Sequence, residues 1–117
     1  MRAFDPQAVA AARRSQPNDQ GLERAAECLG VLAHPSRLRL LTALDGRELC
    51  VCDCAQVLAA KVPATSQHLK ELRRLGAITF RAVGKMAYYR LADRRWLALA
   101  ETAVKLAAHP LALRASA

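Results

Sequence analysis

Thiol groups are the clearest chemistry in this 117-residue sequence, and three of its four cysteines lie within five residues; the four are Cys28, Cys50, Cys52 and Cys54. Such close neighbours are poor partners for loop-closing disulfides and good metal ligands in a reducing cytosol. We expect Asp53 to cap a helix over about 54–60. Cys50 and Cys52 then lie in extended backbone, where residues two apart project the same way, so both could bind one ion.

The thiols at this position suit a soft ion. The positive end of the helix dipole favours thiolate, the form that binds metal. Soft ions such as Cd²⁺, Pb²⁺, Hg²⁺ and As(III) prefer thiolates, and two thiolates leave the coordination incomplete. Cys28, on the flank of a predicted helix, is the favoured third ligand, and Cys54, expected to point into the core, is a weaker candidate. His34, His68 and His109 are isolated, which argues against a structural zinc site.

Positive charge is concentrated in one part of the chain. The formal net charge is +8, and residues 70–95 carry eight Lys and Arg against two Asp and Glu, a net +6. A solvated face is the ordinary meaning of such a run, but double-stranded DNA is the partner that best explains it, because cations neutralise phosphates.

Apolar spacing predicts the elements that must position these groups: helices over about 6–14, 22–33, 35–44, 54–60, 63–75 and 94–108, and a hairpin over 77–91. Residues 15–21 are expected to be a polar linker. Gly76 is expected to end the 63–75 helix and Asp93 to cap the last one.

Two short helices, a tight turn and a hairpin in this order predict a mainly α, dimeric winged helix-turn-helix with 63–75 as the recognition helix. The side chains predicted to face the bases are Ser66, Gln67 and Lys70, and Gln67 could contact adenine bidentately. Those suited to phosphates are Arg73, Arg74, Arg81, Lys85 and Arg90. His68 is expected to pack within the fold.

The last helix carries a narrow apolar seam that suits a partner helix: Trp96, Leu99, Ala103 and Leu106. We therefore expect a homodimer with terminal helices at the interface. The expected organisation is an N-terminal arm with a short helix (1–20), a DNA-binding and dimerisation domain (21–109) and a C-terminal tail (110–117).

Several classes of protein are disfavoured. The five scattered glycines form no phosphate-binding loop, and no apolar stretch suits a signal peptide or membrane span, so we expect a cytoplasmic protein without an organic cofactor. An enzyme with Cys50 as nucleophile would need a nearby base, and none is evident.

The segment GRELCVCDCAQVLAAKVPATSQHLKELRRLGAITFRAVGKMAYYRL resembles the ArsR/SmtB family of metal-responsive repressors, and Ala33-His34-Pro35-Ser36-Arg37-Leu38 resembles its helix-start segment. The resemblance extends over about 22–108, and its ELCVCD motif is similar to that of ArsR- and CadC-type arsenic and cadmium sensors. It implies a homodimer that holds an operator until Cys50 and Cys52 ligate a metal or metalloid, which derepresses an efflux or detoxification operon.

The sequence departs from the family pattern at the remaining ligands. Ala55 stands where ArsR-type sensors have a third cysteine, and residues 1–20 lack the cysteines of CadC-type sensors. The zinc-type pattern on the last helix is absent, since Arg95, Leu106 and His109 stand at its later positions. An alternative is a redox-sensing winged-helix repressor, in which Cys50 and Cys52, or Cys28, are oxidised.

Overall fold

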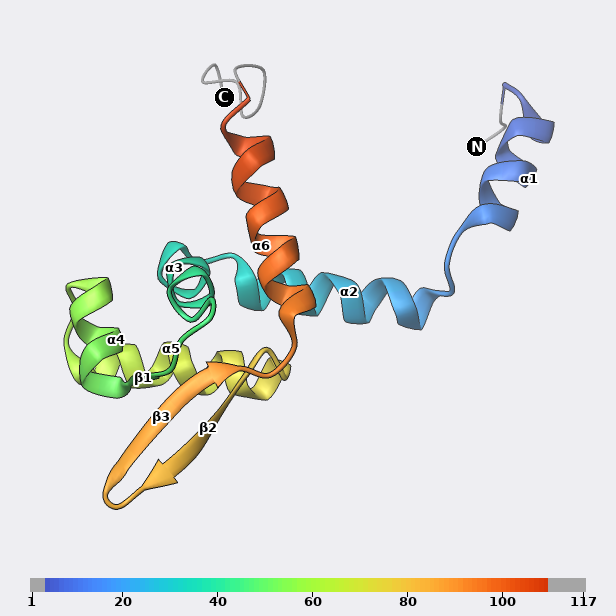
Figure 1. Ribbon diagram of the computed structural model, residues 1–117. Coiled ribbons are helices and arrows are strands. Elements are labelled where there is room, and N and C mark those ends of the chain that lie inside the picture. The colour runs from blue at the N-terminus through green and yellow to red at the C-terminus, as the bar shows by residue number, and fades with distance from the viewer. Residues whose placement is uncertain (1–3, 110–117) are drawn as a thin grey trace. The chain divides into compact units, whose positions relative to one another are not determined.

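The computed structural model describes residues 4–109 and shows a mainly helical chain with one small sheet (Figure 1). The elements are α1 (Pro6–Ser15), α2 (Asp19–Leu32), α3 (Pro35–Ala43), β1 (Leu49–Cys50), α4 (Val51–Leu58), α5 (Val62–Leu75), β2 (Ile78–Val83), β3 (Met86–Leu91) and α6 (Arg94–Ala107). The predicted tail, 110–117, lies outside the described residues. No helix among those described is long and apolar enough to cross a membrane.

The chain divides into two units, of which the first ends at Gly30. In this unit Asp5 caps α1 by accepting the amide of Ala8 at 3.0 Å. Helix α2 begins within the expected linker, because the Asn18 side chain accepts the amide of Gly21 at 2.7 Å. The linker prediction over 15–21 was therefore wrong for its second half. Of the described residues of this unit, all but the half-buried Cys28 are exposed.

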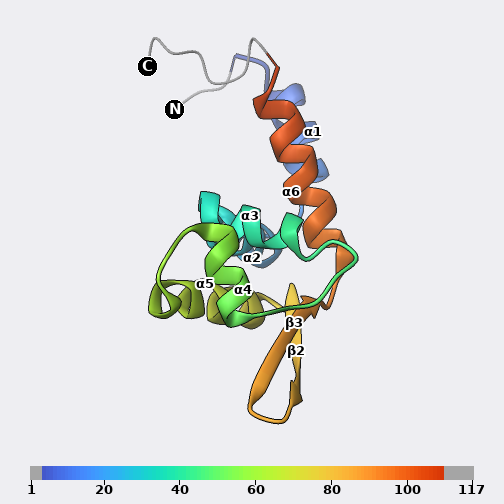
Figure 2. The ribbon, with the colours of Figure 1, turned by 60° about the vertical axis from the view of Figure 1, so that its left-hand side comes forward.

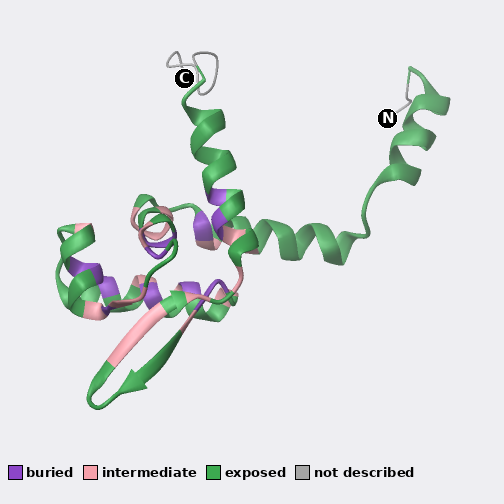
Figure 3. Cartoon of the chain, viewed as in Figure 1, coloured by how far each residue is buried: buried purple, intermediate pink, exposed green. Residues whose placement is uncertain are grey.

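The second unit begins at Val31 and contains the hydrophobic core, which lies where α3, α4, α5 and α6 meet (Figure 3). Among the described residues, its largest fully buried side chains are Leu40, Leu41, Leu44, Cys54, Thr65, Leu69, Leu72 and Leu97. Thr65 is the one polar member, and its hydroxyl donates to the carbonyl of Lys61 at 3.0 Å. The core thus fixes the inner faces of the four helices.

Helices α4 and α5 form the helix-turn-helix. Ala59 ends α4 with a left-handed backbone (φ 51°), and the amide of Ala60 donates to the carbonyl of Ala55 at 3.0 Å. Gly76 ends α5 at φ 83°, as predicted, since glycine adopts this conformation without a Cβ penalty. The prediction that Asp53 caps α4 was wrong: the helix begins at Val51, with Cys50 as its N-cap.

The sheet is antiparallel with strand order β1-β3-β2, and the β2–β3 hairpin extends away from α4 and α5 as the wing (Figure 2). Strand β1, which was not predicted, pairs Leu49 with Tyr89 and Cys50 with Tyr88. The wing turns at Gly84, whose φ of 61° is again left-handed. This pairing places the cysteine segment directly beside the wing.

Candidate metal centre and nucleic-acid interface

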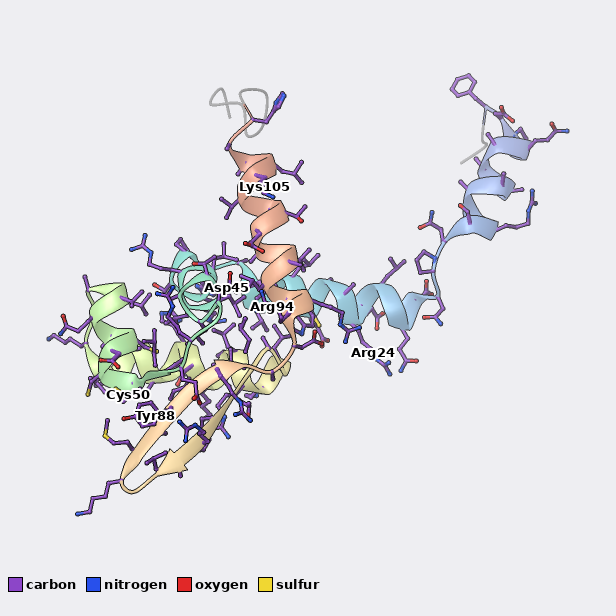
Figure 4. The ribbon with its side chains drawn as sticks, viewed as in Figure 1. Arg24, Asp45, Cys50, Tyr88, Arg94 and Lys105 are labelled. Carbon is purple, nitrogen blue, oxygen red and sulfur yellow. The ribbon has the colours of Figure 1, made fainter. Side chains whose placement is uncertain are left out.

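Cys50 and Cys52 lie at the junction of β1 with α4. Cys50 is 6% exposed and stands beside Tyr88 of β3 (Figure 4), while Cys52 is exposed in the first turn of α4. The expectation that both occupy extended backbone was wrong, because pairing with β3 stops at Cys50 and the helix starts at the next residue. Both thiols still lie at the N-terminus of α4, where the helix dipole favours negative charge.

Cys54 belongs to the core, as its helical spacing predicted. It is fully buried, and burial, followed by the nearby Cys50 and Asp53, raises its pKa to about 11. At neutral pH Cys54 is therefore a protonated thiol surrounded by apolar side chains. This makes it a poor metal ligand.

The third ligand is not supplied by the neighbourhood of Cys50 and Cys52. Within residues 4–109, no three His, Cys, Asp or Glu side chains are grouped closely enough to hold a metal ion. Cys28 belongs to the first unit of the chain. The donor set of the junction, two thiols of which one is exposed, fits two positions of a soft ion and calls for a further donor.

The recognition helix presents the predicted base-reading side chains to solvent. Ser66, Gln67 and Lys70 are all exposed on α5. The Gln67 amide donates to Glu71 over a long 3.4 Å, and Glu71 also accepts from Arg74 at 3.3 Å. Because its hydrogen bond to Glu71 is long and exposed, the Gln67 amide can exchange this bond for one to a base edge at little cost.

A basic hollow of about 390 Å³ lies where α5 meets β2. It is lined by Lys70, Arg73, Arg74, Ile78 and Thr79. The Arg73 guanidinium lies 4.4 Å from the centroid of the Phe80 ring, which holds it at the base of the wing. Three cations around one hollow make a surface suited to phosphate oxygens.

Further cations lie along the wing. Lys85 follows Gly84 in the turn, and Arg90 is exposed on β3. Arg81 differs from them, because its Nε lies 2.8 Å and 3.1 Å from the two carboxylate oxygens of Glu48. This hydrogen bond is the main cause that lowers the pKa of Glu48.

His68 packs within the fold, as expected. It is half-buried on α5, and its Nδ1 accepts a hydrogen bond from Arg37 Nε at 3.2 Å. Arg37 also donates to the carbonyl of Val31 at 2.9 Å. Arg37 therefore joins the start of α3, the end of α2 and the recognition helix.

The seam predicted on α6 is divided between two roles. Leu97 and Ala100 face the core, and Trp96 packs against it, whereas Leu99 and Leu106 are 38% and 66% exposed. Ala103 is exposed as well. A hollow of about 310 Å³, lined by Asp93, Arg95, Trp96 and Leu99, lies at the start of this outer face. The outer face of α6 is an apolar surface that the described residues of its own unit, 31–109, leave uncovered.

Two residues of this site had no role assigned from the sequence. Glu48 was part of the ELCVCD motif, but its partner Arg81 is 33 positions away, and only the strand register brings them together. Arg37 lies 31 positions from His68. One pattern could have indicated the pair of Glu48 and Arg81. It is an acidic residue two positions before a paired strand residue, together with an arginine in the neighbouring hairpin.

The recognition helix, the wing and the basic surface define a winged helix-turn-helix DNA-binding protein with a thiol pair at the start of its first motif helix. Residues 34–79 match the model of the arsR family of bacterial regulatory proteins. The chain is 44% identical over 84 residues to a transcriptional repressor SmtB homolog of Synechocystis sp., a match that covers 69% of this chain and 64% of that protein.

A second relative is the cadmium resistance transcriptional regulatory protein CadC of Listeria innocua, which is 37% identical over 83 residues. The match covers 70% of this chain and 70% of that protein. A solved homodimeric winged helix-turn-helix DNA-binding domain from Mycobacterium bovis gives a TM-score of 0.66 at 26% identity, covering 82% of this chain and 95% of that one. The chain belongs to the arsR family. It is thus a DNA-binding transcriptional regulator rather than an enzyme.

Proposed function

We propose that this protein is a cytoplasmic metal- or metalloid-sensing repressor that binds operator DNA as a homodimer. It is released when thiolates ligate a soft ion of the group Cd²⁺, Pb²⁺, Hg²⁺ and As(III), and the release derepresses resistance or efflux genes. Cys50 and Cys52 are the proposed ligands, with Cys28 as the third. The proposed organisation is an arm (1–20), a DNA-binding and dimerisation domain (21–109) and a tail (110–117).

The position of Cys50 carries this proposal. It is the N-cap of α4, the first helix of the helix-turn-helix, and it pairs with Tyr88 of the wing. A bound ion that draws Cys50 and Cys52 together must therefore shift the start of α4. Because α4 packs on α5, that shift displaces Gln67 relative to the recognition helix of the second protomer. A dimer reads two half-sites at a fixed spacing, so this displacement weakens binding.

The contacts with DNA are proposed as follows. Ser66, Gln67 and Lys70 enter the major groove, and Arg73, Arg74, Lys85 and Arg90 contact phosphates. Arg81 is not in this group because its Nε is bound to the carboxylate of Glu48. The dimer interface includes Trp96, Leu99, Ala103 and Leu106, which is supported by the exposed apolar face of α6 and by the homodimeric structural relative.

The kind of effector is supported by the donors and by one relative. Thiolates select soft ions, and the name of the Listeria protein gives cadmium resistance as its role. Coupling between thiol site and recognition helix need amount only to the usual scale of allostery, about 1–3 kcal/mol, or roughly 5- to 150-fold in affinity.

The test combines two titrations of the reduced protein with Cd²⁺ and, separately, As(III). Near-ultraviolet sulfur-to-metal absorbance measures ligation, and fluorescence anisotropy of a duplex selected by this protein from a random library measures DNA affinity. We expect stoichiometric ligation that weakens DNA binding. Cys52→Ser and Cys50→Ser should abolish the response and keep the metal-free affinity, and Cys28→Ser should weaken ligation. DNA binding indifferent to both ions would refute the proposal.

A redox switch is the second candidate, favoured by the exposure of Cys52 in the first turn of α4. Two thiols would lose two electrons and two protons to hydrogen peroxide, giving one disulfide and two waters. With metals chelated, peroxide should then release DNA and dithiothreitol should restore binding. A wild type that ignores peroxide but responds to Cd²⁺ leaves only the metal-sensing function.

A further inference from the structure

An ion pair connects the cysteine segment to the wing. Arg81 on β2 donates its Nε–H to both carboxylate oxygens of Glu48, which lies two residues before Cys50. The side chains are 31% and 52% exposed, so the pair is partly accessible to solvent. Exposed pairs add little to folding stability, and the interest of this one lies in what it connects.

The same connection is made through the sheet. Tyr88 is paired with Cys50 on one side and with Arg81 on the other. Paired residues of an antiparallel sheet point to the same face, so these three side chains share one face. The Arg81 guanidinium lies 5.7 Å from the centroid of the Tyr88 ring. Figure 4 shows Cys50 and Tyr88 next to each other at this position.

The opposite face of the sheet leads to the recognition helix. The neighbouring row of paired residues is Leu49, Tyr89 and Phe80, and the Phe80 ring lies against Arg73 of α5. The cysteine segment, the wing and α5 are therefore in mechanical contact through adjacent rows of one small sheet.

We propose that Arg81 is a positioning residue, held by Glu48 to tie the wing to the cysteine segment, and that it makes no phosphate contact in the metal-free complex. This inference rests on the proposed metal-sensing function. In the proposed coupling, ligation of Cys50 by the metal ion moves Glu48, and Glu48 moves the wing through its contact with Arg81. No other described cation of the proposed DNA surface forms an ion pair as short as this one, since the distance from Glu71 to Arg74 is 3.3 Å.

The geometry of the pair supports this assignment. Arg81 Nε lies 3.1 Å and 2.8 Å from the two carboxylate oxygens of Glu48. The charge of Arg81 is already balanced by the carboxylate of Glu48, so the held guanidinium adds little net positive charge to attract a phosphate. Release of Arg81 therefore adds one phosphate contact, whereas its removal takes none away.

The dependence of DNA affinity on salt distinguishes these roles. Each phosphate contact contributes about one unit to the slope of log affinity against log salt. We expect Glu48→Gln to steepen the metal-free slope by about one, because it frees Arg81, and Arg81→Gln to leave it unchanged. Lys85→Gln is the matched control on the same hairpin and should flatten the slope by about one. Thermal unfolding would verify that each variant is folded.

The response to Cd²⁺ tests the coupling. Glu48→Gln and Arg81→Gln should each reduce the Cd²⁺-induced loss of DNA affinity at least threefold, while the absorbance titration keeps the wild-type stoichiometry. The double variant Glu48→Arg/Arg81→Glu, which exchanges the two charges, should again lose DNA affinity when Cd²⁺ binds, as the wild type does. A purely structural role would not be rescued in this way.

Two results would overturn the inference. The first is an Arg81→Gln slope that falls as the Lys85→Gln slope does, which makes Arg81 a phosphate contact. The second is an undiminished Cd²⁺ response in both single variants. A wild type that binds DNA but ignores Cd²⁺ contradicts the proposed function instead, and the slopes then still decide how Arg81 is engaged.

Discussion

Arg37 Nε donates to Nδ1 of His68 across 3.2 Å, so an arginine at the start of α3 holds the middle of the recognition helix. The bond requires a neutral imidazole, since a protonated one has no acceptor nitrogen. The orientation of α5 therefore depends on the protonation state of His68.

Stability should fall in mild acid because of this contact. Burial, then the charges of Arg37 and His34, lower the pKa of His68 below 6.5. The folded protein thus binds this proton less readily than the unfolded chain, so the contribution of His68 is complete above about pH 6.5 and is lost as the pH falls to the lowered pKa. Urea unfolding between pH 7.5 and pH 5 measures it.

The matched variants separate His68 from the other histidines. His68→Asn keeps an acceptor near the Nδ1 position and cannot titrate, so its stability should change less over this range than that of the wild type. His34→Asn should retain most of the wild-type pH dependence. Equal pH profiles for wild type and His68→Asn would show that the contact does not titrate.

The cysteines should differ sharply in reactivity. In the native protein at pH 8, iodoacetamide should modify the exposed Cys52 first and the fully buried Cys54 last, because alkylation requires an accessible thiolate. Peptide mass spectrometry over time measures this order. Cys54→Ser should cost about 1–3 kcal/mol by placing a hydroxyl in the core. Cys52→Ser should stay within about 0.5 kcal/mol of wild type.

The end of the recognition helix should be sensitive to one methyl group. Gly76 has φ 83°, and a Cβ there would meet no atom within 4 Å, so any cost comes from the backbone alone. Gly76→Ala should destabilise the fold by about 1–2 kcal/mol. Gly30→Ala, at a helical position with equally open space, should be neutral or slightly stabilising. Equal effects of the two substitutions would contradict this explanation.

The start of α6 should loosen in strong acid. Hydrogen bonds from the Arg95 side chain and backbone lower the pKa of Asp93 to about 2. Because the pKa of Asp93 is lower in the folded protein than its ordinary value of 3.8, the ionised carboxylate stabilises the fold above about pH 3.8. This contribution is lost as the pH falls through about 2. Trp96, the single tryptophan, should report the change by fluorescence. Asp93→Asn should show the loosened state already at neutral pH and no further change in this range.

Local sequence features predicted most of the second unit. Gly76 and Asp93 mark their helix ends by backbone freedom and capping chemistry, and both act as predicted. Leu69 and Leu72, which recur at helical spacing, are buried on the inner face of α5. These features are decided by residues a few positions apart.

The start of α4 depends on distant residues and could not be predicted this way. Asp53 has the side chain of a helix cap, but the register of Cys50 with Tyr88 fixes where extended backbone ends. The engagement of Arg81 by Glu48 is decided by the same register. The metal and DNA roles of the remaining site residues stay predictions.

The uncovered face of α6 has a consequence for the amount of working protein. Leu99, Val104 and Leu106 are 38%, 53% and 66% exposed, and association would remove them from water. Folding and pairing then share one equilibrium, so the melting temperature should rise with chain concentration. In a cell that makes few copies, the fraction of chains paired for DNA binding would depend on the rate of their own synthesis as well as on the proposed effector.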